Sequence, residues 1–225
     1  DGAGPGSEFR ARAVPLSAAA DFSCAIDALD AGWCWGNGNT GQLGDGDTIN
    51  SVRPVALAGG HRFTAVSAGS FHACALETDS TAWCWGTNFT GRLGSGSLTG
   101  REPVPLPVAG GHHYLRLSAG GAHSCGLRVG GAAECWGENS WGQLGTGDTV
   151  LAASPAVVAT GLRFTQVTAG DFHSCALDRG GAAWCWGANF RGQLGAGDTA
   201  ASSVPRLVTG SHTFVTVEAG AFFTC

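Results

Sequence analysis

The sequence predicts an all-β fold, a β-propeller made of four-stranded antiparallel blades. The first observation is a repeat, because Trp-Gly pairs at 35–36, 85–86, 136–137 and 186–187 recur every 50 or 51 residues. The second is a GQLG or GRLG motif that starts six residues after each of these tryptophans. The third is that no window has a helical period, while 38 of the 225 residues are glycine, as expected for short elements joined by tight turns.

The elements of one repeat can be assigned in chain order. The expected strands are Phe63–Ala68, His72–Glu77, Thr81–Trp85 and Pro103–Val108. Asp79 and Ser80 supply the tight turn between the second and the third strand. The prolines of the last segment place it at a sheet edge, because proline cannot donate to a strand ladder. Four short antiparallel strands in about 50 residues are typical of a propeller blade.

The repeats also divide the chain. Residues 1–9 are interpreted as an N-terminal tail, a candidate tag remnant. The propeller repeats of residues 10–225 are expected at 10–60, 61–111, 112–161 and 162–210, with a partial repeat at 211–225. Cys225 lies one period after Cys175, and its expected partner at about position 235 is not in the sequence. We therefore expect three further blades in a longer protein.

Eight of the nine cysteines form four pairs with a separation of ten residues. The pairs are Cys24/Cys34, Cys74/Cys84, Cys125/Cys135 and Cys175/Cys185. In each predicted hairpin the two cysteines oppose each other, and opposed positions lie ~4.5 Å apart at Cα, within reach of a disulfide. Each bridge would add roughly 3 kcal/mol of stability. Zinc sites and free thiols are weaker alternatives, because the pairs lack neighbouring metal ligands and free thiols would not explain the spacing. Bridges in every repeat favour an extracellular or periplasmic location.

The repeat resembles a known family. The pattern A-G-x-x-H-x-x-x-L, as at Ala68–Leu76, followed by W-G-x-N-x-x-G-Q-L-G, is similar to the repeat of the regulator-of-chromosome-condensation family over roughly residues 10–225. The resemblance implies a seven-bladed propeller. It implies no single activity, because members include a nuclear exchange factor for a small GTPase, a plant UV-B photoreceptor and a secreted β-lactamase inhibitor. The chain departs from the family in its four complete repeats and in its cysteines.

Charge and hydropathy exclude some partners. The net charge is −5, and the twelve Lys and Arg residues are scattered, which argues against nucleic-acid binding. No stretch of eighteen apolar residues predicts a transmembrane segment, although association with a membrane complex stays open. We expect no cofactor.

Several polar residues recur in the repeats and could suggest a metal or phosphate site, but structural roles explain them better. His72, His123 and His173 share one repeat position and could form a ring of metal ligands. The first repeat lacks this histidine and the fifth has Phe222-Phe223, so hydrogen bonds to neighbouring backbone groups are favoured. The glycine-rich loops precede no helix, which argues against a phosphate site.

Aspartates in the same loops, and a search for catalytic motifs, lead to similar conclusions. The loop carboxylates are too few for calcium and fit Asx turns; they are Asp45, Asp47, Asp148 and Asp198. No catalytic motif is present, so an enzyme is not expected.

Two sets of tryptophans have structural roles. The motif tryptophans, Trp35, Trp85, Trp136 and Trp186, are expected to pack between blades. Trp33, Trp83 and Trp184 precede them by two residues on the same sheet face and are expected to pack as well.

The loop after the third strand varies between repeats and gives the candidate binding residues. Trp141 occupies a position held by Thr40, Thr90 and Arg191 in the other repeats. Connections of a four-stranded meander alternate between faces, so the first and third connections open on one face. The residues predicted to bind a partner there are Phe71, Phe89, Trp141, Phe172, Phe190 and Arg191. The alternative is that these rings pack into neighbouring blades.

These observations favour a non-catalytic protein-binding module of an exported protein, an accessory subunit on a larger assembly. The alternative function is an exchange factor or an enzyme-regulating, inhibitor-like propeller.

Overall fold

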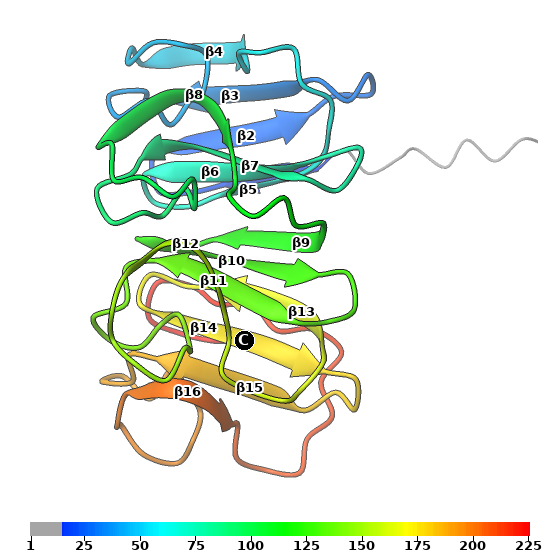
Figure 1. Ribbon diagram of the computed structural model, residues 1–225, viewed down its shortest axis with the longest axis vertical. Helices are drawn as coiled ribbons and strands as arrows, with labels where there is room; N and C mark the ends of the chain where they lie inside the picture. The colour runs from blue at the N-terminus through cyan, green and yellow to red at the C-terminus, as the bar shows by residue number, and fades with distance from the viewer. Residues whose placement is uncertain (1–14) are drawn as a thin grey trace, which may run out of the picture.

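A computed structural model describes residues 15–225, and the predicted tail, residues 1–9, lies outside these residues. The chain forms four antiparallel four-stranded sheets, and the described residues contain no helix. The sheets follow one another along the long axis of the molecule (Figure 1). The all-β, bladed fold predicted from the repeat is therefore confirmed.

Each sheet is one blade with its strands in chain order. The first blade contains β1 (Leu16–Ala18), β2 (Phe22–Ile26), β3 (Gly32–Gly36) and β4 (Ser51–Ala56). The second contains β5 (Phe63–Ala68), β6 (His72–Glu77), β7 (Ala82–Thr87) and β8 (Arg101–Pro107). The third contains β9 (Tyr114–Ala119), β10 (His123–Arg128), β11 (Ala133–Gly137) and β12 (Ala152–Val157). The fourth contains β13 (Phe164–Ala169), β14 (His173–Asp178), β15 (Ala183–Gly187) and β16 (Ser202–Leu207).

In the second blade β5 and β6 match their prediction, whereas both ends of β7 and of β8 differ from it by one or two residues. Strand β7 starts one residue later than expected, because Thr81 forms an isolated bridge with His113 of the next blade. Strand β8 is the last strand of its sheet, so its prolines lie at a sheet edge, as predicted.

The glycine of each Trp-Gly pair marks a register shift between the third and fourth strands. In the second blade, Gly86 has φ +107°, and a Cβ there would lie 2.6 Å from the carbonyl oxygen of Phe71. Any larger residue would therefore clash with the neighbouring strand as well as strain its own backbone.

The motif tryptophans join consecutive blades. Trp85, Trp136 and Trp186 are fully buried, as predicted, whereas Trp35 of the first blade is only half-buried. The indole Nε1 of Trp85 donates to the carbonyl oxygen of Gln42 in the preceding GQLG loop, at 3.0 Å. The ring also occupies the space above the last glycine of that loop: at Gly44, a Cβ would lie 2.7 Å from Nε1 of Trp85. The Trp-Gly pair and the GxLG motif are thus two halves of one contact between blades.

The innermost strands are also joined at a fixed interval. A Ser or Thr hydroxyl of each blade accepts a hydrogen bond from an alanine backbone N–H of the next. The four bonds are Ala68 to Ser17, Ala119 to Ser67, Ala169 to Ser118 and Ala219 to Thr168, at 2.9–3.1 Å. Every blade therefore holds its successor by both its inner strand and its outer loop.

All four predicted disulfides are present. The bonded pairs are Cys24–Cys34, Cys74–Cys84, Cys125–Cys135 and Cys175–Cys185, each with a Cα–Cα distance of 4.1 Å. The paired cysteines face each other in the strand register and are fully buried. Cys225 is free and exposed. Over residues 15–225, a membrane-crossing helix is not found.

Candidate binding face

The first-to-second and third-to-fourth connections of every blade open on one side of the propeller. We call this side the aromatic face, defined by the loops 19–21, 37–50, 69–71, 88–100, 120–122, 138–151, 170–172 and 188–201. It is the side on which the residues predicted to bind a partner were expected.

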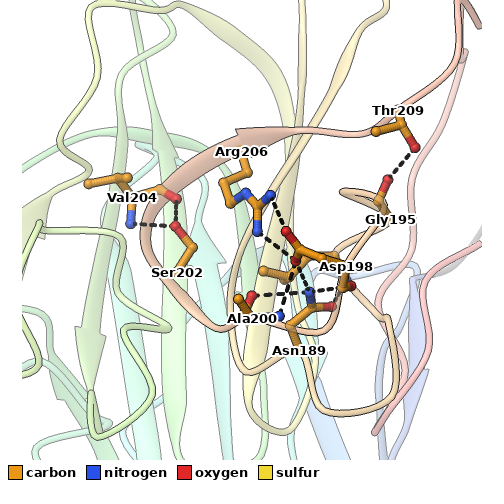
Figure 2. Close-up of polar contacts among 9 residues, drawn as sticks. Asn189, Gly195, Asp198, Ala200, Ser202, Val204, Arg206 and Thr209 are labelled. Carbon is orange, nitrogen blue, oxygen red and sulfur yellow. Dashed lines mark hydrogen bonds and ion pairs between the residues drawn. The ribbon is translucent and has the colours of Figure 1, made fainter.

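The long loops of this face are held in one conformation by their own polar groups. Figure 2 shows the loop of the fourth blade, in which Nδ2 of Asn189 donates to the carbonyl oxygens of Asp198 and Ala200 at 2.9 and 3.1 Å. Arg206 forms a bidentate ion pair with Asp198, at 2.8 and 2.9 Å. The pKa of Asp198 is lowered to about 2, chiefly by Arg206. Side chains carried by such a loop are presented in a fixed position.

The loop aspartates form Asx turns, as predicted. The Oδ1 atoms of Asp47, Asp148 and Asp198 each accept the backbone N–H two residues further on, at 2.8, 3.2 and 3.0 Å. Among the residues that the structure describes, no group of His, Cys, Asp and Glu side chains could hold a metal ion.

Three of the predicted residues form one aromatic strip. Trp141 lies edge-to-face on Phe190 with ring centroids 5.7 Å apart, and Phe190 lies 6.0 Å from Phe222. Phe222 in turn stacks on Phe172 at 5.6 Å. Trp141 and Phe190 are each 47% exposed. Phe222 was missed in the sequence, although it shares the repeat position of Phe71 and Phe172.

The other predicted residues surround this strip. Phe71 is half exposed and shares a surface hollow with Phe172. Phe89 is 62% exposed and lies against Gly100, and it has no ring contact within residues 15–225. Arg191 is exposed, and its backbone N–H donates to Oε1 of Gln193. The structure thus presents all six residues on one face, and four rings form a continuous surface.

The repeated histidines bind hydroxyl groups rather than backbone groups, which corrects the expectation from sequence. Nε2 of His72 and of His123 lies 2.8 Å from the hydroxyl of Ser124 and of Ser174 in the next blade, and His173 contacts Thr224 at 2.9 Å. Each of these hydroxyls in turn donates its single proton to a carbonyl of the intervening GxLG loop.

That arrangement fixes the protonation state of these histidines. Since the hydroxyl proton is used, Nε2 must carry the hydrogen and donate it. Burial lowers the pKa of His123 to about 3 and that of His173 to about 4. These rings are structural hydrogen-bond donors buried between blades, and they do not face a shared site.

The third blade contains a buried carboxylate in place of an outer tryptophan. Trp33, Trp83 and Trp184 each donate their Nε1 proton to a carboxylate of the same blade. Glu134 occupies the equivalent position and accepts from Tyr114 and His112 at 2.8 Å and from Arg128 at 3.1 Å. Burial and the Glu134 carboxylate raise the pKa of Tyr114. Every charged group in this cluster has a partner, so the cluster is explained by packing.

Comparison with known proteins agrees with this architecture. Residues 33–76, 135–177 and 180–225 match the regulator of chromosome condensation (RCC1) repeat, and a second form of that repeat matches residues 63–92 and 164–193. Together these segments cover more than half of the chain, which belongs to the regulator of chromosome condensation repeat family. No individual curated protein is significantly similar to it.

Solved structures share the fold. Human WBSCR16 aligns with a TM-score of 0.84 at 24% identity, covering 92% of this chain and 56% of that one. Prp20p from Saccharomyces cerevisiae aligns with a TM-score of 0.85 at 22% identity, over 94% and 55%. The ectodomain of the receptor kinase CR4 from Physcomitrella patens aligns with a TM-score of 0.61 at 26% identity, over 93% and 47%. The chain spans about half the length of these proteins.

Proposed function

We propose that this chain is a non-catalytic protein-binding module of an exported protein, acting in an extracellular or periplasmic compartment as an accessory subunit of a larger assembly. The observation that carries the proposal is the aromatic strip from Trp141 to Phe172 on the aromatic face. Clustered exposed aromatic residues mark partner sites in many proteins, and Trp and Arg are enriched among residues that dominate binding energy.

The four disulfides support the proposed location. Bridges of this kind persist in oxidising compartments and are rare in the cytosol. The CR4 structure, which is similar to this chain, is a receptor ectodomain. The alternative function is regulation of an enzyme or a GTPase: Prp20p binds Gsp1p and histones, but at 22% identity that likeness concerns the fold alone.

Site-specific photo-crosslinking tests the proposal. A photoreactive phenylalanine analogue replaces Trp141 in one protein and Val129 in another. Val129 is a matched control, because it is exposed and lies in the β10–β11 turn on the opposite face. We expect position 141 to capture a protein from the extracellular or periplasmic fraction, with excess unmodified chain preventing capture. Equal capture from both positions, or none from 141, would contradict the proposal.

The substitution Trp141→Ala separates binding from packing. Because the side chain is half exposed on a loop, we expect the thermal unfolding midpoint to stay unchanged while partner affinity falls by roughly 2 kcal/mol or more. A destabilised protein with unchanged affinity would show that the ring serves the fold instead.

A further inference from the structure

One hollow on the aromatic face differs from the rest because it contains a buried cation. It lies between Phe71 of the second blade and Phe172 of the fourth, and Arg92, Ser70 and Asp171 complete most of its wall. Its volume is about 180 Å³. Small-molecule sites usually occupy ~300–1,000 Å³, so the hollow suits one side chain rather than a cofactor.

Two departures from the repeat meet at this hollow. The third blade has Ala122 where the second and fourth have Phe71 and Phe172, and the missing ring leaves the space. The GxLG loop of the second blade has Arg92 where the other three loops have glutamine. The first blade has Asp21 at the phenylalanine position and keeps Gln42 in its loop.

The arginine replaces a residue with a clear structural role. Gln143 and Gln193 each accept a hydrogen bond at Oε1 from the backbone N–H two residues earlier, at 2.9 Å. A guanidinium cannot accept this bond, so Arg92 removes a loop contact. It also introduces a charge that is only 7% exposed, and burial lowers the pKa of Arg92.

The guanidinium is incompletely paired. Nε donates to the Thr90 hydroxyl at 3.2 Å and Nη1 donates to the Gly121 carbonyl at 3.0 Å, both neutral acceptors. Among the described residues, Nη2 has no hydrogen-bond partner and no carboxylate forms an ion pair with Arg92. The Asp171 carboxylate in the same hollow accepts instead from the Ser70 hydroxyl at 3.2 Å. The Glu138 carboxylate interacts with Arg92 electrostatically but forms no direct ion pair with it. A ligand carboxylate could therefore bond directly to the guanidinium, and charge-assisted hydrogen bonds of this kind are strong.

We infer that this hollow receives an acidic side chain of the protein partner, with its carboxylate on Arg92 and its aliphatic part between Phe71 and Phe172. The inference rests on the proposed function, because it identifies the chemistry of a partner at that same face. Asp171 in the same wall repels any anion but can accept a peptide N–H, so a polypeptide can offset the repulsion with a hydrogen bond from its backbone.

Selection from a phage-displayed library of random linear peptides on the 225-residue chain tests the inference. We expect the enriched peptides to share an Asp or Glu next to apolar residues. Two variants restore the residues of the other repeats and should therefore fold: Arg92→Gln removes the charge, and Ala122→Phe fills the hollow. Each should weaken binding of a fluorescein-labelled enriched peptide about tenfold or more. Arg163→Gln, which removes an exposed charge on the opposite face, should leave binding unchanged.

The outcomes separate this inference from the proposed function. Peptides without an acidic preference, whose binding is lost in Trp141→Ala, would overturn the inference and leave the proposed function intact. Acidic peptides that require Arg92 but neither Trp141 nor Phe190 would support the inference and contradict the role of the aromatic strip. Competition by inorganic phosphate at concentrations equal to those of peptide would overturn the preference for a polypeptide.

Discussion

The contact between the first and second blades differs from those that follow it at one pair of positions. In the later contacts a buried histidine donates to a hydroxyl of the next blade, as His123 does to Ser174. In the first contact the equivalent residues are Phe22 and Ala73, which lie in one apolar cluster. Both members of the polar pair are thus absent together.

A buried histidine at this position therefore needs a hydroxyl opposite it. A buried imidazole N–H without an acceptor would cost about 1–3 kcal/mol. An apolar pair avoids that cost by removing donor and acceptor at the same time. The chemistry of each contact between blades is therefore determined by a pair of residues about 51 positions apart, and not by one repeat alone.

Removing a disulfide tests whether the apolar contact of the first blade and the polar contacts of the later blades depend equally on the disulfide of the blade. Replacing both cysteines of Cys24–Cys34 or of Cys125–Cys135 by alanine should lower the free energy of unfolding by about 3 kcal/mol in each case, because the constraint on the unfolded chain is the same. Urea unfolding measures both. A loss at Cys125–Cys135 that is larger by ~2 kcal/mol would instead assign a role to the Ser174 hydroxyl, 3.5 Å from Sγ of Cys125.

A polar residue in the apolar contact should be nearly as damaging. Phe22→His loses buried ring area and places an N–H opposite Ala73, so we expect a loss of about 2–3 kcal/mol. Adding Ala73→Ser supplies the missing acceptor, and its hydroxyl can donate to the Gln42 carbonyl as Ser174 does to Gln143. The double variant should recover about half of the loss in urea unfolding. No recovery would mean that the pair is not the relevant unit.

The polar contacts should make stability depend on pH. The pKa of His123 falls from 6.5 to about 3 on folding, because of burial. Below pH ~6.5 the unfolded chain therefore binds the proton first, and stability decreases as the pH falls toward the folded value. His123→Phe combined with Ser174→Ala copies the first contact, and it should reduce the stability difference between pH 7 and pH 5 by about 2 kcal/mol. An unchanged difference would exclude this histidine as its source.

The smallest effects should distinguish the two partners of the hydroxyl. Ser174→Ala leaves the His123 N–H without an acceptor and should cost about 1–2 kcal/mol. Ala73→Ser alone should change stability by less than about 1 kcal/mol, because the new hydroxyl can still donate to a backbone carbonyl. Thermal unfolding of the two variants measures both losses of stability. Equal losses would contradict the different roles assigned to the two hydroxyl positions.

Much of this architecture could be predicted because the repeat compares the chain with itself. The Trp-Gly period, the ten-residue cysteine spacing and the glycine content led to the blades and to all four disulfides. The partner of each histidine could not be predicted, because a position in one repeat does not reveal which group of the next repeat faces it. That contact needs the distance between blades, which the strand pattern does not contain.

The residues of the candidate binding face could be predicted only in part, for the same reason. Alternation of the meander placed Trp141 and Phe190 on one side, but their contact and the addition of Phe222 depend on the angle between blades. Arg92 could not be predicted as a binding residue, because a lone arginine in a glycine-rich loop is typical of a solvated position. Only its burial beside Ala122 shows that two variable positions meet.

The offset between each histidine and its hydroxyl also restricts how such an array can grow by duplication. A tandem copy of the third blade would place His123 opposite the Ser124 of its own copy, and the fourth blade would match itself through His173 and Ser174. A copy of the second blade would instead place His72 opposite Ala73. Gene duplication can therefore lengthen this protein readily from its third or fourth repeat, whereas a copy of the second repeat would need a compensating substitution before it could fold as well as its parent.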